Sequence, residues 1–445
     1  MKKILLFLAL AVGLLTSAST AMAQVNMSRY ITLTVKSGEA IKLDFAAASA
    51  GTPVRIVSGS NTQDITVGTS WYDGNFPSTF TVTAGASTMT VYGDIIAFRC
   101  DNNGANLTAL DPSHHTELRL LSCHSNQLTS LDVSKNTQLM ALSCHSNQLT
   151  SLDVSKNTQL TELNCSENQL TTLDVSHNTQ LTLLSCFSNR LSILDVSGCT
   201  QLTRLRCYSN RLTSLDVSHN TQLTELNCSE NQLTTLDVSH NTQLTLLSCF
   251  SNQLSILDVS KNTQLTVLYC HRNQLSSLDI SKNTKLKTLH CHGNNLSTQV
   301  LDDIFCALPD RTGKYNGVID PVLNSSDPNH ATVLATNAQN ATNKNWKVQY
   351  FSSDTDIPAT TGTYVCGTPH TDIAEASAEQ ALTLYPNPVA DVLYLSATAR
   401  TIRIYNIYGI EVAHATDTDR IDVASLPAGV YTVKADGTVA KMVKR

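Results

Sequence analysis

Aromatic residues make up only 5% of the 445 residues, so any core must be built mainly from aliphatic side chains. An excess of basic charge is also missing. The formal net charge is −6 and the pI is near 6.1, which argues against a nucleic-acid-binding or membrane-surface protein. No apolar run after the N-terminal stretch reaches the length of a transmembrane helix. The apolar content of 41% still suffices for a core, and the length suggests two or three domains.

Motifs of known catalytic sites are missing as well. The sequence contains no G-x-S-x-G, no H-E-x-x-H and no glycine-rich phosphate loop. Each serine, histidine and aspartate of the central region occupies a position of the repeat described below. We therefore expect no enzyme activity, no catalytic residue and no cofactor.

The N-terminus has the three parts of a targeting signal. Lys2 and Lys3 form a charged start, residues 4–15 are apolar, and residues 21–23 form a small-x-small cleavage site. This pattern predicts a signal peptide over residues 1–23 and therefore a secreted protein.

Cysteines recur at a fixed spacing of 21 residues through the middle of the chain. A constant period of this length indicates stacked units that are each too small to bury a core alone. One unit, residues 160–180, has the sequence LTELNCSENQLTTLDVSHNTQ, which fits the leucine-rich-repeat pattern with cysteine in the third apolar position. The pattern predicts a leucine-rich-repeat array over residues 95–296. Its cysteine column consists of Cys123, Cys144, Cys165, Cys186, Cys207, Cys228, Cys249, Cys270 and Cys291.

The repeat also predicts the geometry of each coil. Alternation around Leu163 and Cys165 indicates a short strand with both side chains inward, and successive strands then lie parallel. Asn168 falls at the turn, where a buried amide satisfies backbone groups. A coil of 21 residues leaves little room for a helix on the outer side, so we expect extended or 3₁₀ segments there. The predicted fold class is a curved parallel β-solenoid with little helix.

The cysteines of the column are predicted to be buried free thiols. In-register parallel side chains do not converge as a disulfide requires, so disulfides and metal thiolates are the less favoured alternatives. Cys199 replaces the asparagine of the second half of the repeat, which fits a buried position, and Cys100 starts the column in an imperfect first unit. The state of Cys306 and Cys366, beyond the array, stays open.

The repeat unit resembles the cysteine-bearing 21-residue repeats of internalin J-like bacterial surface proteins. Internalin-like proteins are adhesins, so the resemblance implies attachment to host or neighbouring cells without naming a ligand. Residues 160–197 and 223–260 are also near-identical copies that differ only at Arg190 against Gln253. Such an array changes length by recombination, which a binding surface tolerates better than a precise active site.

The flanks of the array are predicted to be caps. Residues 24–94 are β-like and are expected to cover the first coil, with a separate binding function as the alternative. Residues 297–352 are expected to form a mixed C-terminal cap, with a helix over 301–308 and a helix running into a strand over 331–348. Residues 353–378 lack any period and are rich in Thr, Ala, Asp and Pro, which predicts a linker.

The last segment, residues 379–445, is predicted to be a small β-sandwich. It resembles the C-terminal sorting domain of the bacterial type IX secretion system. The resemblance implies export by that machinery, removal of the domain, and attachment to surface lipopolysaccharide on the outer cell surface of a Gram-negative bacterium. Another adhesive β-sandwich is the alternative. The matching motifs are Tyr385-Pro386-Asn387-Pro388, Ile404-Tyr405-Asn406 with Gly409, Leu426 to Tyr431, and the basic end Lys441 to Arg445.

Exposed strand positions of the array are the candidate ligand-binding residues. An aromatic and histidine stripe with scattered arginines on a concave face suits protein or glycan recognition, because these side chains offer large areas with polar edges. A solvated face without a partner is the alternative. The candidates are His124, His145, Phe187, Tyr208, Arg204, Arg206, Phe250, Tyr269, His271, Arg272, His290 and His292.

Two features raise the question of metal binding, and we predict no metal site for either. The histidines at the two ends of the stripe lack a nearby acidic ligand in the sequence, and the adjacent cysteines point inward. The aspartates of the L-D-V-S segments form a column for which turn capping is favoured over calcium, because glycine-rich calcium loops are absent. That column is Asp132, Asp153, Asp174, Asp195, Asp216, Asp237, Asp258 and Asp279.

Together these features predict a cell-surface adhesin that binds through the concave face of the array. The expected partner is a host protein or glycan, or other bacterial cells in a biofilm, and no nucleic acid. The alternative is a passive structural surface protein without a specific ligand.

Overall fold

The computed structural model describes residues 24–69, 79–367, 384–406, 411–436 and 438–445. It divides into two compact units, residues 1–368 and 369–445, which are treated separately below. The predicted signal peptide, residues 1–23, lies outside the described residues.

The first unit begins with two antiparallel sheets packed on each other. One has the strand order β4-β3-β6-β1-β8, and in the other β2 pairs with β5 and β7. Alternating side chains such as Ile31 and Leu33 are fully buried between the sheets, as the period of two requires. The strands are β1 (Tyr30–Val35), β2 (Ala40–Ala47), β3 (Thr52–Ser58), β4 (Asn61–Val67), β5 (Thr79–Thr83), β6 (Thr88–Gly93), β7 (Ile95–Arg99) and β8 (Leu107–Asp111).

The array follows as a stack of three-residue parallel strands, one in each coil. β7 pairs in parallel with the first of them, so the sheet of the N-terminal region continues into the array without an open edge between them. The central leucines pair directly, as Leu142 does with Leu163, and no register shift occurs along the stack. The strands are β9 (Leu120–Ser122), β10 (Ala141–Ser143), β11 (Glu162–Asn164), β12 (Leu183–Ser185), β13 (Arg204–Arg206), β14 (Glu225–Asn227), β15 (Leu246–Ser248), β16 (Val267–Tyr269) and β17 (Thr288–His290).

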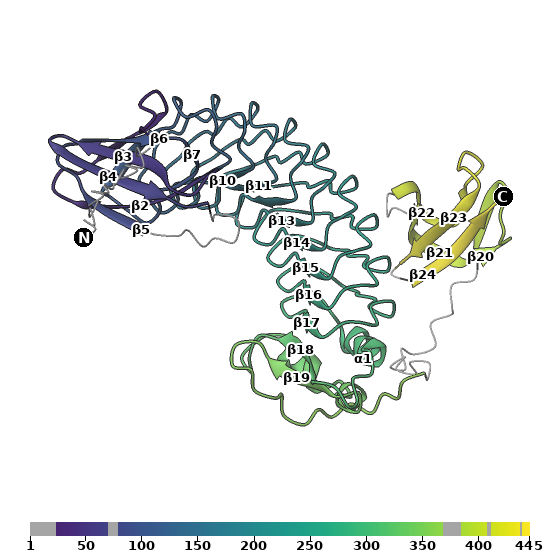
Figure 1. Cartoon of the computed structure of the whole chain (residues 1–445). Coiled ribbons are helices and arrows are strands. Elements are labelled where there is room, and N and C mark those ends of the chain that lie inside the picture. Colours follow the sequence, from purple (N-terminus) through teal and green to yellow (C-terminus); the bar gives the residue numbers. More distant parts are fainter. Residues whose placement is uncertain (1–23, 70–78, 368–383, 407–410, 437) are drawn as a thin grey trace, which may run out of the picture. The chain divides into compact units, whose positions relative to one another are not determined.

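The predicted solenoid of 21-residue coils is confirmed. The coils follow an arc with the strands on its inner side and loops on its outer side (Figure 1). The loop side of the described coils consists of extended segments and turns, without a helix.

Two columns of buried asparagines connect neighbouring coils. Asn168 accepts a hydrogen bond from the backbone N–H of Leu149 at 3.0 Å and donates to the carbonyls of Cys144 and Cys165, each at 3.1 Å. Asn178, in the second half of the coil, donates to the carbonyls of Val154 and Asn157 at 3.0 and 2.9 Å. These amides satisfy turn backbone groups that the sheet leaves unpaired.

The cysteine column is buried and unpaired by disulfides, as predicted. All nine members, together with Cys100 and Cys199, are free and buried. Burial raises the pKa of the Cys165 thiol to about 12, so the column stays protonated and chemically inert. The thiol of Cys199 lies 3.5 Å from the carbonyl of Val175 and thus takes the place of the missing asparagine.

The C-terminal end of the array is closed by a mixed region. Ser297 caps α1 (Thr298–Ala307) by accepting a hydrogen bond from the N–H of Val300. Strands β18 (Gly317–Val322) and β19 (Trp346–Tyr350) extend the array sheet beyond β17 in parallel. The helix expected before β19 is instead two short helices, α2 (His330–Leu334) and α3 (Gln339–Thr342). None of the helices in the described residues is long and apolar enough to cross a bilayer.

The segment predicted as a linker from residue 353 is docked on this cap as far as Gly367. The N–H of Thr361 bonds to the carbonyl of Leu334 at 2.8 Å, and Asn337 donates to the carbonyl of Tyr364 at 2.7 Å. A disulfide joins Cys306 and Cys366, two cysteines whose state the sequence left open. The linker prediction was therefore wrong for residues 353–367, because these contacts join segments far apart in the sequence and leave no periodic trace. Residues 368–378 of the predicted linker lie outside the described residues.

The second unit is an antiparallel β domain. Its strands are β20 (Leu384–Tyr385), β21 (Val392–Tyr405), β22 (Glu411–Asp422), β23 (Gly429–Ala435) and β24 (Thr438–Lys444). The sheet order is β20-β21-β23-β24, and β22 pairs with β21. A small core of its own includes Leu393, Ile402, Val433 and Met442, all at most 1% exposed.

Candidate binding face

The strand side of the array presents three columns of outward side chains. In each coil the middle residue of the strand and the column cysteine point inward, so their neighbours point outward. In the coil of β13, Leu205 and Cys207 are buried, whereas Arg204 is exposed and Arg206 and Tyr208 are partly exposed. We define the strand face as the columns that run through these last three residues. The unshifted parallel register aligns equivalent side chains of neighbouring coils.

The third column of the strand face, the residues after the cysteines, consists largely of stacked ring pairs. The coil spacing places neighbouring rings at face-to-face contact, with interplanar angles of 7° to 11° in three pairs. The serines at positions 166 and 229 interrupt the column and are fully buried beside the larger rings. The three pairs are His124–His145 at 4.2 Å, Phe187–Tyr208 at 4.3 Å and Phe250–His271 at 4.4 Å between ring centroids.

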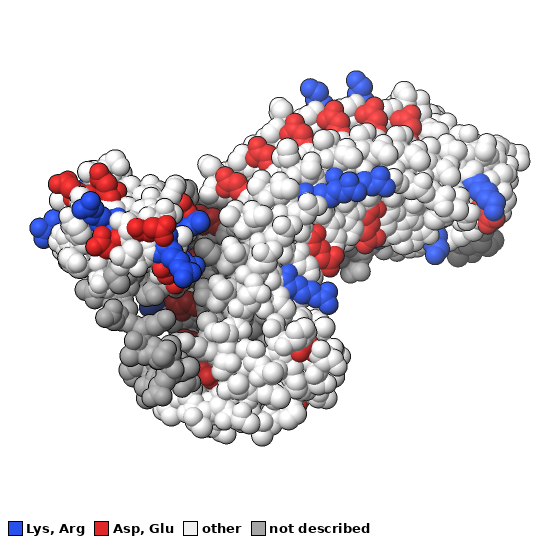
Figure 2. All heavy atoms as spheres, turned by 180° about the vertical axis from the view of Figure 1, so that it is seen from behind, with Lys and Arg blue, Asp and Glu red and all other residues white. Residues whose placement is uncertain are grey.

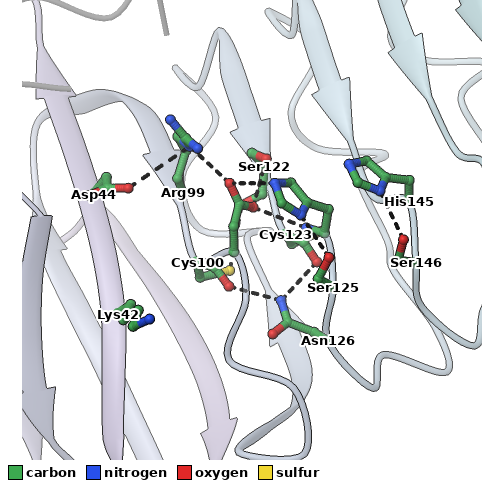
Figure 3. Close-up of polar contacts among 12 residues, drawn as sticks. Lys42, Asp44, Arg99, Cys100, Ser122, Cys123, Ser125, Asn126, His145 and Ser146 are labelled. Atoms are coloured by element: carbon green, nitrogen blue, oxygen red, sulfur yellow. Dashed lines mark hydrogen bonds and ion pairs between the residues drawn. The ribbon is translucent and has the colours of Figure 1, made fainter. Parts of the chain in front are cut away.

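At the N-terminal end, the buried carboxylate of Asp101 fixes the first ring. His124 Nε2 lies 3.2 Å from one carboxylate oxygen, to which Arg99 Nε also donates at 2.9 Å. Ser122 donates to the other oxygen at 2.7 Å, and Asp44 lies 4.0 Å from Arg99 on the adjacent strand (Figure 3). Burial alone would raise the pKa of Asp101, but the contacts with His124, Ser122 and Arg99 lower it overall, so the carboxylate stays ionised.

Asp101 was missed as a site residue, although the sequence contained the signal. It directly follows Cys100, the first member of the cysteine column, and therefore occupies the same column as His124. The imperfect first unit concealed this equivalence.

The middle of the strand face combines an aromatic pair with an ion pair. Arg206 on β13 donates to both carboxylate oxygens of Glu225 on β14, at 2.8 and 3.3 Å. Burial raises the pKa of Tyr208, so its phenol stays protonated and able to donate. Arg204 lies exposed on the same strand as Arg206. In the register of the parallel strands, Glu225 lies next to Arg204 in the first column, as the repeat period predicts.

At the C-terminal end, two predicted contact residues are not accessible. His271 is 6% and His292 is 1% exposed, and their ring centroids lie 5.3 and 4.4 Å from that of Phe351. Phe351 directly follows β19, and its ring covers both histidines. The expectation that these two residues face a ligand was therefore wrong, and no periodic signal identified Phe351.

Burial also changes the chemistry of these histidines. It lowers the pKa of His271 to about 3 and that of His292 to about 4, so both rings are neutral near pH 7. Both ring nitrogens of His292 and Nδ1 of His271 are buried without a hydrogen-bond partner among the described residues.

The remaining predicted residues of this end are at least partly exposed. The rings of Tyr269 and His290 stack at 4.4 Å, and His290 Nε2 lies 3.0 Å from the buried carboxylate of Asp320. Burial raises the pKa of Asp320 to about 7 and lowers that of His290 to about 4. Arg272 is exposed one residue beyond the third column, in a turn with φ of 53°.

The aspartate column caps turns. In all eight coils one carboxylate oxygen accepts a hydrogen bond from the backbone N–H two residues later, as Asp174 does from Ser176 at 2.9 Å. The hydrogen bonds from Ser176 lower the pKa of Asp174. A row of acidic side chains along the array is visible in Figure 2. Within the described residues, no three histidine, cysteine or acidic side chains are arranged to hold a metal ion.

Comparisons with known proteins give one family match, for the second unit, and several similar solved structures. Residues 383–445 match the family described as secretion system C-terminal sorting domain. Among solved structures, the functional domain of InlJ from Listeria monocytogenes, which includes a cysteine ladder, is 28% identical, with 82% of this chain and 94% of that chain covered and a TM-score of 0.43. A comparison with curated proteins found no match.

Two further solved structures are more distant. A leucine-rich-repeat protein from Leptospira interrogans is 24% identical over 44% of this chain and 61% of its own, with a TM-score of 0.38. The internalin InlF from Listeria monocytogenes is 19% identical over 52% of this chain and 81% of its own, also with a TM-score of 0.38. The sorting-domain match indicates a type IX secreted, surface-associated protein. The chain thus joins a leucine-rich-repeat array with a cysteine ladder, similar to that of InlJ, to a C-terminal domain that matches the secretion sorting family.

Proposed function

We propose that this protein is a cell-surface adhesin that binds a protein or glycan through the strand face of its array. The observation that carries the proposal is the stacked pair of Phe187 and Tyr208 beside the ion pair of Arg206 and Glu225. All four side chains are at least partly exposed in the middle of the strand face.

The chemistry of this patch suits recognition. Stacked rings give a flat area that costs little conformational entropy to order, and the tyrosine hydroxyl adds a polar contact. Arginine held by a carboxylate at 2.8 Å is preorganised for hydrogen bonding at its free edge. Aromatic residues and arginine are also the types enriched at the energetic centres of interfaces.

The sorting domain supports display on the cell. We propose that the type IX machinery carries the chain over the outer membrane, that the domain matching residues 383–445 is removed, and that the remainder is attached to surface lipopolysaccharide. The partner is then a host surface protein or glycan, or another bacterial cell. Enzyme activity and a resident cofactor are not part of this proposal.

Adhesion of cells with and without the gene tests the proposal. Wild-type cells, a deletion strain and a complemented deletion strain are compared on host-coated surfaces and in self-aggregation. We expect the deletion to reduce attachment in one of the two assays, and complementation to restore it. A defect confined to host-coated surfaces assigns a host receptor, and a defect confined to aggregation assigns a role in biofilm. Unchanged attachment in both assays would contradict the adhesin proposal and favour a passive structural protein.

A further inference from the structure

A basic pocket lies between the last coil of the array and the loop that follows α1. Its volume is about 740 Å³, within the range of small-molecule sites. Lys285 and Lys287 line it from the coil, and Arg311, Lys314 and Tyr315 line it from the loop. None of the residues that line it belongs to the strand face.

Among the regular coils, lysine occupies these two repeat positions only in the last coil. The position of Lys285 is glutamine in each of the seven preceding coils, and the position of Lys287 is threonine in six of them. Both substitutions therefore occur in the one coil that the cap loop faces.

Lys287 also lacks the hydroxyl with which threonine at this position donates a hydrogen bond to the preceding coil. The hydroxyl of Thr266 donates to the carbonyl of Thr245 at 3.0 Å, and Thr245 bonds in the same way to Thr224. Lys287 keeps only the backbone bond, from its N–H to the carbonyl of Thr266 at 2.8 Å. Because the substitution gives up a bond that six of the seven preceding coils retain, stabilisation of the coil does not account for it.

Hydrogen bonds to three backbone carbonyls fix the backbone of the cap loop. The guanidinium of Arg311 donates twice to the carbonyl of Tyr315, at 3.0 and 2.7 Å. Asn345 donates to the carbonyl of Lys314 at 2.8 Å, and Trp346 to that of Pro309 at 2.8 Å. Tyr315 itself is 94% exposed, a high value for an aromatic ring on a fixed loop.

The described residues that line the pocket carry more positive than negative charge. Within the part of the chain that the structure describes, no carboxylate lies at ion-pair distance from Lys285, Lys287 or Lys314. Among the described residues that line the pocket, the only acidic one is Asp310, whose carboxylate accepts a hydrogen bond from the N–H of Thr312 at 2.8 Å. The hydrogen bonds from Thr312 and the nearby charges of Lys314 and Lys344 lower the pKa of Asp310. Lys285 donates to the side chain of Gln264, which carries no charge.

We propose that this pocket binds an anionic saccharide, a sugar that bears a carboxylate, phosphate or sulfate group. The lysine ammonium groups neutralise the anion, and the exposed ring of Tyr315 stacks on the apolar face of the sugar. The site is separate from the strand face, so it does not depend on the adhesin proposal. Bacterial surface sugars and host glycans both supply such ligands.

Calorimetric titration of the purified protein tests the site. The probes are 3-deoxy-octulosonic acid for bacterial surface sugars, sialyllactose and a sulfated heparin disaccharide for host glycans, and neutral lactose as the reference. The test variant, Lys285→Gln with Lys287→Thr, installs the residues of the other coils and should fold normally. The matched control, Lys261→His with Lys282→His, changes two lysines elsewhere in the array to a residue that the same column uses at His177 and His219. A third variant is Tyr315→Ala.

At least one anionic probe should bind more tightly than lactose, with an affinity that falls as salt is added. The double lysine variant should lose at least tenfold in affinity, Tyr315→Ala about three- to tenfold, and the control less than twofold. The preferred probe distinguishes the bacterial from the host source. The proposal is wrong if no anionic probe binds better than lactose, or if the double lysine variant, folded by its thermal unfolding curve, binds as the wild type does.

Discussion

The strand face has a histidine pair near each end, and the two pairs are built alike but presented differently. His124 and His145 stack at 4.2 Å, and His271 and His292 stack at 4.5 Å, each residue directly after a column cysteine. The first pair remains partly exposed and is anchored by Asp101. The second pair is covered by Phe351.

The comparison shows that the repeat determines stacking, whereas the caps determine access. Coil spacing alone brings equivalent rings into contact, because it is close to the optimal stacking distance. Whether a ring then meets solvent depends on a segment outside the repeat. The third column of the strand face is therefore expected to be accessible from the N-terminal pair to about Phe250, and to be covered at His271 and His292.

The largest change in the difference between the two histidine pairs should come from removing the disulfide of the C-terminal cap. Cys306 and Cys366 are 60 residues apart, and loss of a link across such a loop costs about 4 kcal/mol in the chain-entropy model. In the variant Cys306→Ser with Cys366→Ser, urea denaturation should show an earlier transition of the C-terminal region. Diethyl pyrocarbonate should modify His292 faster and His124 at an unchanged rate. Equal modification rates of His292 in the variant and the wild type would show that its burial under Phe351 does not depend on the disulfide.

The second-largest effect should come from acidification, which should destabilise the end of the strand face that Phe351 covers. The pKa values of His271 and His292 are about 3 and 4 in the folded protein, below the ordinary 6.5, so stability is complete above pH 6.5 and falls as the pH drops below it. For each of the two histidines, the free energy of unfolding is about 2 kcal/mol lower at pH 5 than at neutral pH. The raised pKa of Asp320 and the lowered pKa of His290 act in opposite directions and largely offset each other.

Hydrogen exchange at pH 7.5 and pH 5 measures this difference. Amides of β17 and β19 should lose protection at pH 5, after correction for the intrinsic rate. The His145 pKa is lowered in the same direction, but its ring is partly exposed, so β9 and β10 should lose less. Equal loss at the two ends would contradict the assignment of the effect to the covered histidines.

Phe351→Ala should have a smaller effect that is confined to the covered end. The ring is only partly buried, so we expect a loss of about 1–2 kcal/mol, less than for a fully buried phenylalanine. The pKa values of His271 and His292, followed by NMR titration, should rise towards 6.5 as water reaches the rings. Unchanged values would mean that the array itself, and not Phe351, buries them.

The smallest effect should come from Asp101→Asn at the open end. The amide keeps an oxygen for Ser122 but loses the charge that faces Arg99 and His124, which should cost about 1 kcal/mol. NMR should show chemical-shift changes at the ring of His124 in the variant and none at the ring of His292. A shift at His292 would show that the two ends are coupled through the array.

The repeat made much of this structure predictable, and the caps did not. The inward positions of Leu163 and Cys165, the turn role of Asn168 and the free thiols follow from a local pattern that recurs in every coil. The cover of His292 by Phe351 depends on a contact across 59 residues that occurs once. A single long-range contact has no period, so a sequence pattern does not reveal it.

The array itself supplies a direct test of the strand face. Serine occupies the third column at positions 166 and 229, so Phe187→Ser, Tyr208→Ser and Phe250→Ser should be tolerated by the fold. The matched control is Ile193→Thr with Ile256→Thr, which removes side chains that are 75% and 73% exposed and lie outside the strand face. Attachment of cells that display each variant, at equal surface amounts, is the deciding measurement. We predict at least a tenfold loss for the triple serine variant and none for the control, and wild-type attachment by the triple variant would contradict the account.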